Sequence, residues 1–546
     1  MRALVQQHRR WRTGAVVASA SLVIAAWPAL AGPVKVTLQP VIVQAASDTV
    51  ALTAVDAVIA ANGGVGQVVV TLPLVNGVLA NLTTIEVTQL SASYAVSPDA
   101  KVLTSMAPAK GSPPPPTRQL DNVFPQVTGA TAAIANGNSG QGVGVAVIDT
   151  GIADLPDFTG RLRTGVDFTS ENNPHLDSYG HGTFVAGLIA GDGSSSSGAY
   201  VGEAPGADLV PVKVAGKSGS TTVSTLIRAL QWIKDDTADN IRVINMSVGA
   251  IPQGPTALNP LDQAVETMWN AGFAVVTSAG NNGPYRGTVT SPGDDPLVIT
   301  VGALDDKDTV TPDDDTVPSF SSNGPTSWDA WWKPDLIAPG KSVVSVMAPR
   351  SVIWNNFKSA RVGTANFVGS GTSFAAAITS GAAAMLFVDN PTATPDNVKA
   401  ALLTTTNAGP GTPQDPFQQG HGVLDVARAI DEPVLSIVQD VSAIPIPVAG
   451  APIPLLSTQI VSTWASVDLI EQGLYPSAYP FPYVGDATTS LDPDTFSPLF
   501  QSSAWNSSAW NSSAWNSSAW NSSAWNSSAW NSSAWNSSAW NSSAWN

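Results

Sequence analysis

The sequence predicts an α/β fold in which a parallel sheet is flanked by helices, preceded by a small α+β module and followed by a low-complexity tail. Three observations predict this fold. Short apolar runs typical of buried strands occur at residues 143–148, 243–250 and 273–277. Helix starts rich in small residues occur at 180–187 and 371–377. With 546 residues, 43% of them hydrophobic, the chain is long enough for a sizeable core and several regions.

Residues 1–31 have the pattern of an export signal. A basic stretch with Arg9 and Arg10 precedes an apolar core at 14–26, and small residues at 29–31 form a cleavage site. The apolar core is short for a membrane span, which favours removal of the signal over an uncleaved anchor. We therefore expect a secreted, extracellular protein, exported by the general or the twin-arginine route.

Residues 32–105 are expected to form the α+β module. The sequence predicts strands at 36–44 and 66–73, with a helix between them that begins near Ser47 or Asp48. A mixed segment then ends in an extended stretch at 93–102. Residues 106–122 follow as a Pro-rich linker, whose stiff polyproline conformation is exposed to cleavage.

Three short motifs supply an acid, a base and a nucleophile. Asp149 ends the first apolar run, His181 lies between two glycines at a helix start, and Ser373 opens an Ala-rich helix. A serine hydroxyl needs a base to take its proton, and an aspartate fixes the tautomer of that histidine. Each motif alone also suits a turn or a helix cap. Their order along the chain, Asp then His then Ser, predicts a serine peptidase.

Further segments complete the expected site. Asn281 follows the run at 273–277 and is a candidate donor to the oxyanion, together with the backbone N–H of Ser373. An extended substrate is expected to pair with the chain edge at residues 247–249. These substrate-binding candidates are Ser247, Val248 and Gly249, and Gly283 is the candidate for the pocket wall, with 291–293 beside it.

These segments together resemble those of the subtilisin-like serine peptidases, the subtilases. The resemblance covers residues 123–430 and includes the segments at 202–214, 320–325, 333–340 and 420–429. It implies a catalytic domain over 123–430 with Asp149, His181 and Ser373 as triad and Asn281 as oxyanion donor. The expected reaction is the hydrolysis of internal peptide bonds through an acyl-enzyme.

The resemblance also implies features outside the triad. A small module after an export signal is typical of an inhibitory propeptide that assists folding; an unrelated small domain is the alternative. The triad chemistry needs no cofactor, and the family's structural calcium has candidate ligands in Asp157 and in the acidic loop at 305–308. Two positions depart from the family pattern. Phe184 replaces a histidine, and Ala377 replaces a proline that bends the nucleophile helix.

Composition limits the partners of this chain. There are 41 acidic and 24 basic residues, so the net charge of −17 argues against nucleic acid and anionic membranes. The chain has no cysteine, which excludes disulfides and a thiol nucleophile. The expected partners are protein or peptide substrates and the chain's own propeptide.

The C-terminal part differs in character from the rest. Residues 431–501 form a Pro-rich extension, and residues 502–546 repeat the pentapeptide SSAWN nine times. The repeats carry no acid or base, but their tryptophans suit contact with the cell envelope or self-association. A second hypothesis for the whole chain is therefore an adhesion or scaffold protein of the cell envelope that retains the subtilase fold.

Overall fold

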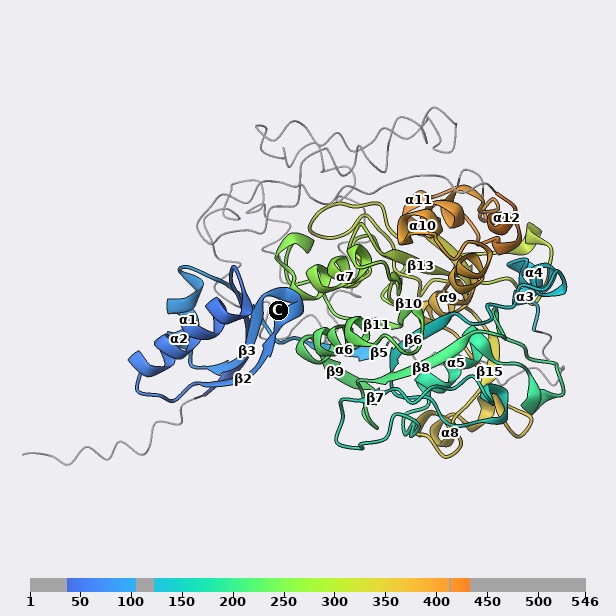
Figure 1. Ribbon diagram of the computed structural model, residues 1–546. Helices are drawn as coiled ribbons and strands as arrows, with labels where there is room; N and C mark the ends of the chain where they lie inside the picture. Colours follow the sequence, from blue (N-terminus) through green and yellow to red (C-terminus); the bar gives the residue numbers. More distant parts are fainter. Residues whose placement is uncertain (1–36, 105–121, 412–413, 433–546) are drawn as a thin grey trace, which may run out of the picture. The chain divides into compact units, whose positions relative to one another are not determined.

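The computed structural model describes residues 37–104, 122–411 and 414–432 (Figure 1). The predicted export signal, most of the linker, the Pro-rich extension and the SSAWN repeats lie outside the described residues. The chain divides into two compact units, Met1–Thr37 and Leu38–Asn546. All contacts reported below lie within the second unit.

The N-terminal module is a four-stranded antiparallel sheet with two helices. Its strands are ordered β2-β3-β1-β4, and its core includes Val43 and Leu82. Helix α1 begins as predicted, because Ser47 caps it by accepting a hydrogen bond from the backbone N–H of Val50. The elements are β1 (Gln39–Gln44), α1 (Asp48–Ala61), β2 (Gln67–Leu72), β3 (Gly77–Leu82), α2 (Thr84–Ser91) and β4 (Ala95–Pro98).

The main sheet has seven parallel strands in the order β14-β13-β12-β10-β6-β8-β7. Most of these strands are buried along their whole length, as the continuous apolar runs predict for a parallel sheet covered on both faces. The strands are β6 (Gly144–Asp149), β7 (Val166–Asp167), β8 (Asp208–Lys213), β10 (Ile241–Met246), β12 (Ala274–Ser278), β13 (Ile299–Leu304) and β14 (Leu336–Pro339).

The helices cover both faces of this sheet. Right-handed connections that step in opposite directions along a sheet place their helices on opposite faces. The step from β6 to β8 goes one way and carries α5 (His181–Ala190); the steps to β10 and β12 go the other way and carry α6 (Val223–Asp235) and α7 (Pro260–Asn270). Helix α9 (Thr372–Asp389) packs against α5, β10 and β12. The two step directions diverge between β6 and β10, and folds of this kind place their binding sites at such a point, beside the carboxyl ends of the strands.

Helix α9 is the one helix among the described residues whose length and composition would suit a membrane span. In the protein 89% of that stretch is buried, as expected for a core helix. It runs without interruption through Ala377, so the helix is continuous at the position where the proline is absent.

Two small antiparallel sheets complete the architecture. One has the order β11-β5-β9, and the other has the order β15-β17-β16. The sequence predicts at 243–250 a buried strand that runs into small residues; in the structure this run consists of β10 and, after Ser247, of β11, which pairs with β5. The strands are β5 (Lys101–Thr104), β9 (Ser220–Thr222), β11 (Val248–Gly249), β15 (Val343–Val346), β16 (Arg361–Val362) and β17 (Asn366–Gly369).

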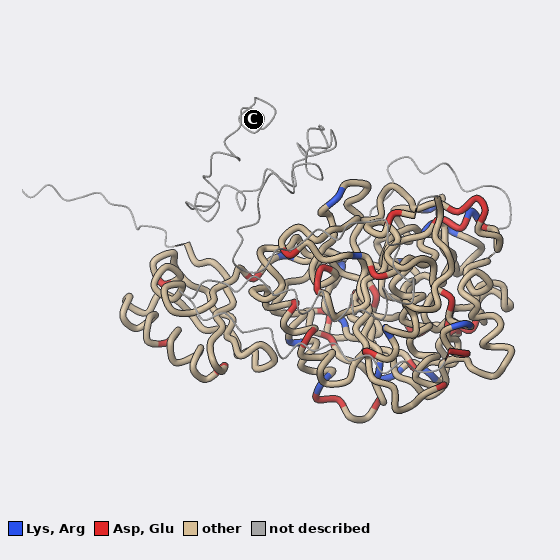
Figure 2. The backbone as a smooth tube through the Cα atoms, turned by 90° about the horizontal axis from the view of Figure 1, so that it is seen from above, with Lys and Arg blue, Asp and Glu red and all other residues tan. Residues whose placement is uncertain are grey.

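The remaining helices have at most ten residues. They are α3 (Phe124–Val127), α4 (Ala130–Ala135), α8 (Val352–Asn356), α10 (Pro395–Thr404), α11 (Pro416–Gln419) and α12 (Val426–Asp431). Two of them, α10 and α12, pack against α9. Figure 2 shows acidic residues along the tube in many places and basic residues in fewer, which agrees with the negative net charge.

Candidate active site

The acid candidate, Asp149, is the last residue of β6. Its side chain is fully buried at the carboxyl end of the sheet, and its Oδ1 accepts a hydrogen bond from the backbone N–H of Thr150 at 2.7 Å. The end of a buried strand therefore places one carboxylate at the carboxyl edge of the sheet.

The base candidate, His181, is the first residue of α5 and is also fully buried. Its Nδ1 lies 2.8 Å from both Oδ1 and Oδ2 of Asp149. Its Nε2 has no hydrogen-bond partner among the residues that the structure describes. The preceding Gly180 has φ 109°, and a Cβ there would lie 2.5 Å from Ser351 Oγ, so this position requires glycine.

Asp177 and Thr150 hold the first turn of α5 in place. The Asp177 carboxylate accepts hydrogen bonds from the N–H groups of Gly180 (2.7 Å) and Thr183 (2.8 Å) and from the Thr150 hydroxyl (2.8 Å). Thr150 Oγ1 in turn accepts the N–H of Gly182 at 2.9 Å. These bonds satisfy helix N–H groups that a glycine at the N-cap leaves unpaired. Sequence reasoning missed both residues, although Asp177 lies four residues before His181.

The nucleophile candidate, Ser373, is the second residue of α9 and is fully buried. Its Oγ lies 3.4 Å from the carbonyl oxygen of Ser247. The next residue, Phe374, lies beside the imidazole of His181, with 5.8 Å between the ring centroids. Phe184 stacks on Phe374 at 4.4 Å, so the departure from the family pattern fills space with an apolar ring. The structure thus brings Asp149, His181 and the start of α9 together.

Asn281 follows β12 and is held by the residue before Ser373. Its Oδ1 accepts hydrogen bonds from the backbone N–H of Thr372 at 2.9 Å and from its hydroxyl at 3.0 Å. Two donors on Oδ1 fix the amide so that Nδ2 points away from Thr372. The sequence indicated Asn281 but not Thr372, whose hydroxyl sets the orientation of the amide.

The predicted substrate edge is occupied by the N-terminal module. In β11, Val248 pairs with Thr104 and Gly249 pairs with Leu103 of β5, antiparallel. On its other side β5 pairs with β9, where Leu103 lies opposite Ser220.

The pocket-wall candidates lie near this edge. Ser291 exchanges two backbone hydrogen bonds with Ala250, which directly follows β11. Gly283 donates its N–H to the carbonyl of Phe320, and a Cβ on it would lie 2.0 Å from the carbonyl oxygen of Ser321. Glycine is therefore required at this position by close packing.

Comparison with known proteins agrees with this geometry. Residues 140–422 match the model of the subtilase family. The chain belongs to the subtilase family. The serine protease AprX of Bacillus subtilis (strain 168) is 42% identical over 309 residues, which cover 55% of this chain and 69% of AprX. Subtilisin DY of Bacillus licheniformis is 33% identical over 302 residues, covering 54% of this chain and 93% of that protein.

A solved structure shows the same fold. Fervidolysin from Fervidobacterium pennivorans, a keratinolytic enzyme related to subtilisin, superimposes with a TM-score of 0.56 at 23% identity. The match covers 73% of this chain and 62% of fervidolysin. The subtilase assignment makes this chain a subtilisin-like serine endopeptidase, and its substrates are peptides.

The calcium candidates are Asp157 and the acidic loop at 305–308. Among the described residues, no group of three or more His, Asp or Glu could hold a metal ion. Asp157 is buried and its carboxylate bonds to the backbone N–H and hydroxyl of Ser195, while Asp305 bonds to Lys307 and Lys341. Both Ser195 donors bond to Asp157 Oδ2, while Asp157 Oδ1 is buried with no hydrogen-bond partner among the described residues.

A buried acidic cluster lies next to the pocket-wall candidates and was missed by the sequence reasoning. It consists of Asp262 and Glu266 on α7, with Asp294 and Asp295 just after the 291–293 segment. Ser291 donates its hydroxyl to Asp262 at 2.6 Å, which connects the cluster to the wall. Burial, reinforced by the neighbouring carboxylates, raises the pKa of Asp262, Glu266 and Asp294 well above their usual range.

The cluster predicts a pH-dependent stability that Asp295→Asn should remove. Burial raises the pKa of Asp295 to about 6 in the folded protein, above its ordinary value of 3.8. The folded state therefore binds more protons between about pH 4 and pH 6, and the free energy of unfolding falls as the pH rises through that window. We expect Asp295→Asn to be more stable than wild type at pH 8 by up to about 3 kcal/mol, and equal near pH 4.

Urea unfolding at pH 4, 6 and 8 measures this difference, with Ser373→Ala in both chains to prevent self-digestion. The exchange leaves the side-chain oxygen that accepts the Leu297 N–H at 2.8 Å. Asp235→Asn, on an exposed carboxylate, controls for the loss of one charge. A stability difference between Asp295→Asn and wild type that is the same at pH 4 and pH 8 would show that Asp295 is not protonated in the folded protein.

Proposed function

We propose that Asp149, His181 and Ser373 form the catalytic triad of this endopeptidase. The observation that carries the proposal is the 2.8 Å contact between His181 Nδ1 and both carboxylate oxygens of Asp149, next to the first turn of α9 that carries Ser373. A carboxylate on Nδ1 leaves Nε2 as the basic nitrogen, which is the nitrogen that must face the nucleophile.

The reaction proceeds in two halves. Ser373 Oγ attacks the carbonyl carbon of the substrate, and His181 Nε2 takes the proton that the hydroxyl loses. The negative oxygen of the tetrahedral intermediate accepts hydrogen bonds from the Ser373 backbone N–H and from Asn281 Nδ2. His181 then gives its proton to the leaving amine, and the C–N bond breaks. Water, deprotonated by the same nitrogen, hydrolyses the acyl-enzyme and restores Ser373.

We further propose that residues 32–105 are an inhibitory propeptide. The support is that β5 lies between β11 and β9, the two strand edges that an extended substrate would use. The module also caps a helix of the catalytic domain. The Asp99 carboxylate accepts the backbone N–H and the hydroxyl of Ser224, each at 2.8 Å, in the first turn of α6. Gln44 donates to Gln263 of α7 at 2.7 Å.

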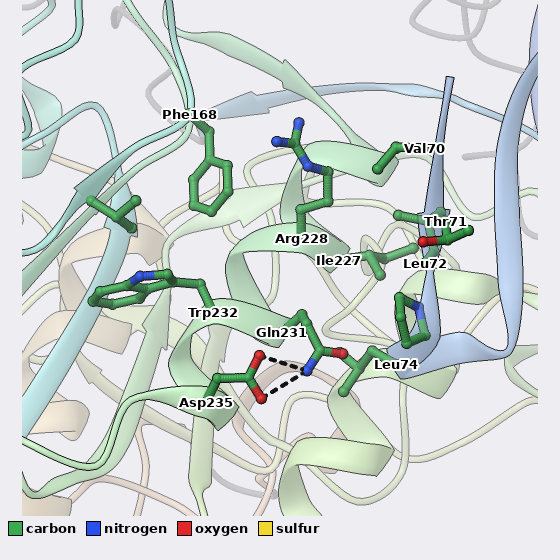
Figure 3. A pocket seen from close by; sticks show the side chains of 12 residues that line it. Val70, Thr71, Leu72, Leu74, Phe168, Ile227, Arg228, Gln231, Trp232 and Asp235 are labelled. Carbon is green, nitrogen blue, oxygen red and sulfur yellow. Dashed lines mark hydrogen bonds between the residues drawn. The ribbon is translucent and has the colours of Figure 1, made fainter. Parts of the chain in front are cut away.

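The packing between the N-terminal module and helix α6 is incomplete. This is expected of a propeptide that must dissociate from the catalytic domain. A cavity of about 270 Å³ lies between residues 70–74 of the module and α6. Figure 3 shows Leu72 and Leu74 on one side, with Arg228, Trp232 and Phe168 on the other. Side chains that line an unfilled cavity make fewer van der Waals contacts. The free energy needed to separate the module from the catalytic domain is therefore lower.

The register of β5 predicts which bond is cut when the propeptide is removed. Val248 pairs with Thr104, the last residue of β5, so β5 ends next to Ser247. The carbonyl of Ser247 is the group that Ser373 Oγ contacts. We therefore expect cleavage between Ser105 and Met106, a bond that lies outside the described residues.

N-terminal sequencing of the processed protein tests this expectation, and Met106 is the expected first residue. The Ser373→Ala chain, which should stay unprocessed, is the control. A mature N-terminus before Leu103 would mean that β5 is not bound in the way a substrate is.

The purified module of residues 32–105 should inhibit peptide hydrolysis by the processed enzyme. A module that does not inhibit would contradict its role as an inhibitor.

The remaining sequence-based expectations complete the proposal. Residues 1–31 direct export and are removed, and the enzyme acts outside the cell on protein substrates. The SSAWN repeats at 502–546 supply contact with the cell envelope through their tryptophans. The triad needs no cofactor, and a structural calcium ion is proposed at Asp157 or at the 305–308 segment. The proposal as a whole is tested by digesting a peptide with the processed chain: fragments cut at internal bonds are expected, and a peptide left intact would contradict it.

A further inference from the structure

A buried polar network joins the middle of the main sheet to the start of α9. Asn245 of β10 is fully buried, and its Nδ2 donates to Ser247 Oγ at 3.0 Å. Ser247 Oγ donates in turn to the carbonyl oxygen of Ser373 at 2.9 Å. Two turns further along the same face of α9, Ser380 Oγ lies 3.1 Å from Asn245 Oδ1 and 2.9 Å from the carbonyl oxygen of Ala376, so these two oxygens share its single hydrogen. One amide therefore bonds, directly or through one hydroxyl, to two points on α9.

The direction of these bonds depends on the amide. A serine hydroxyl has a single hydrogen to donate and two lone pairs that accept. Because Asn245 Nδ2 donates to Ser247 Oγ, the hydrogen of Ser247 is directed to the carbonyl of Ser373. No apolar side chain could impose this direction, and an aspartate would reverse it by accepting the hydrogen of Ser247.

We propose that Asn245 is a positioning residue for the nucleophile. Its amide orients the Ser247 hydroxyl, which holds the Ser373 carbonyl and so sets the first turn of α9, including the Ser373 N–H that faces the oxyanion. The same bond fixes Ser373 relative to the start of the substrate edge at β11. The inference rests on the proposed role of Ser373 as nucleophile.

A purely structural role is the competing explanation. A buried amide must be hydrogen-bonded wherever it lies, and its loss would destabilise the core without changing the chemistry. The two explanations differ in one respect. If Asn245 acts through Ser247, its effect on kcat disappears once the Ser247 hydroxyl is removed.

A double-mutant cycle of Asn245→Leu and Ser247→Ala tests this, with kcat and KM measured on a chromogenic peptide. Each single variant should lower kcat by about 10- to 100-fold, the size expected for a misplacement of about 1 Å, while KM changes less. The double variant should have the kcat of Ser247→Ala alone. Thr379→Val is the matched control, because it removes a buried hydroxyl of α9 that bonds to Ala375 instead of Asn245, and its kcat should match wild type.

Two outcomes would overturn the proposal. One is that Asn245→Leu lowers kcat by the same factor in wild type and in the Ser247→Ala variant. This result would exclude action through the Ser247 hydroxyl. Another is a lower thermal midpoint for Asn245→Leu with kcat unchanged, which would leave a structural role only. The double-mutant cycle needs a measurable kcat for the wild-type enzyme. A wild type that does not hydrolyse the peptide would refute the proposed function and not the positioning role.

Asn245→Asp keeps the test available if the leucine variant does not fold. Its carboxylate would draw the Ser247 hydrogen away from Ser373, so kcat should again fall. Protonation returns a donor to this carboxyl, so the ratio of variant kcat to wild-type kcat should rise as the pH is lowered. A ratio that stays constant with pH would contradict the positioning role.

Discussion

Replacing Ser373 by alanine is expected to abolish peptide hydrolysis while leaving the fold intact. The hydroxyl is the group that attacks the substrate, so its loss should lower kcat by about 10⁶, the size that the same change has in subtilisin. The fold should tolerate the change, because alanine suits the interior of this buried, Ala-rich helix and the exchange removes a single oxygen atom. Hydrolysis of a chromogenic peptide and the thermal midpoint measure the two effects.

The variant must be compared in its processed form, because an unprocessed chain would be inactive for a different reason. Immobilised wild-type enzyme can remove the propeptide in trans and then be filtered off. Retention of more than about one part in 10³ of the activity by the processed variant would contradict the assignment of Ser373. Loss of the thermal transition would instead point to a failure of folding.

Replacing Asn281 by leucine is expected to lower kcat by about 10² to 10³ with little change in KM. Thr372 holds Oδ1 of the Asn281 amide, so Nδ2 points away from Thr372 and is the donor that we assign to the oxyanion. Negative charge on that oxygen exists in the transition state and is absent from the bound substrate, so the lost bond affects turnover more than binding. Steady-state kinetics on one peptide provide both constants.

Asn282→Leu is the matched control for this variant. Asn282 is the next residue and its side chain is exposed, so the same exchange there should leave kcat near wild type. An increase in KM alone for Asn281→Leu would assign Asn281 to substrate binding instead of the oxyanion hole.

Much of the site could be predicted because its residues occupy junctions that local sequence defines. Asp149 ends an apolar strand, His181 opens a helix between glycines, and Ser373 opens an Ala-rich helix. The same is true of Ser47, which caps α1 as expected. Periodicity and capping depend on residues within a few positions, so a single sequence contains this information.

The features that the sequence did not predict depend on contacts between distant segments. Thr372 and Asp177 have roles only because Asn281 and Thr150 lie beside them in the fold. The break at Ser247 arises because β11 pairs with β5, which lies more than a hundred residues earlier in the chain. Such pairings are decided by the packing of the whole chain and leave no local pattern.

The burial of the acidic cluster could not be predicted from the sequence either. Four carboxylates from α7 and from residues 294–295 gather without an equal number of cations, and each looks like a surface residue in the sequence. Acidic residues are seldom fully buried, so composition alone favours a solvated position. The raised pKa values follow from burial, which only the fold determines.

Covalent labelling tests the triad most directly. A fluorophosphonate probe reacts with a serine whose hydroxyl is activated by a neighbouring base, and peptide mass spectrometry locates the modified residue. In the processed wild-type enzyme we expect a single label on Ser373, and we expect His181→Ala to lose it. Labelling of a different serine, or an enzyme that hydrolyses peptides while Ser373 stays unlabelled, would contradict the Asp149, His181 and Ser373 triad.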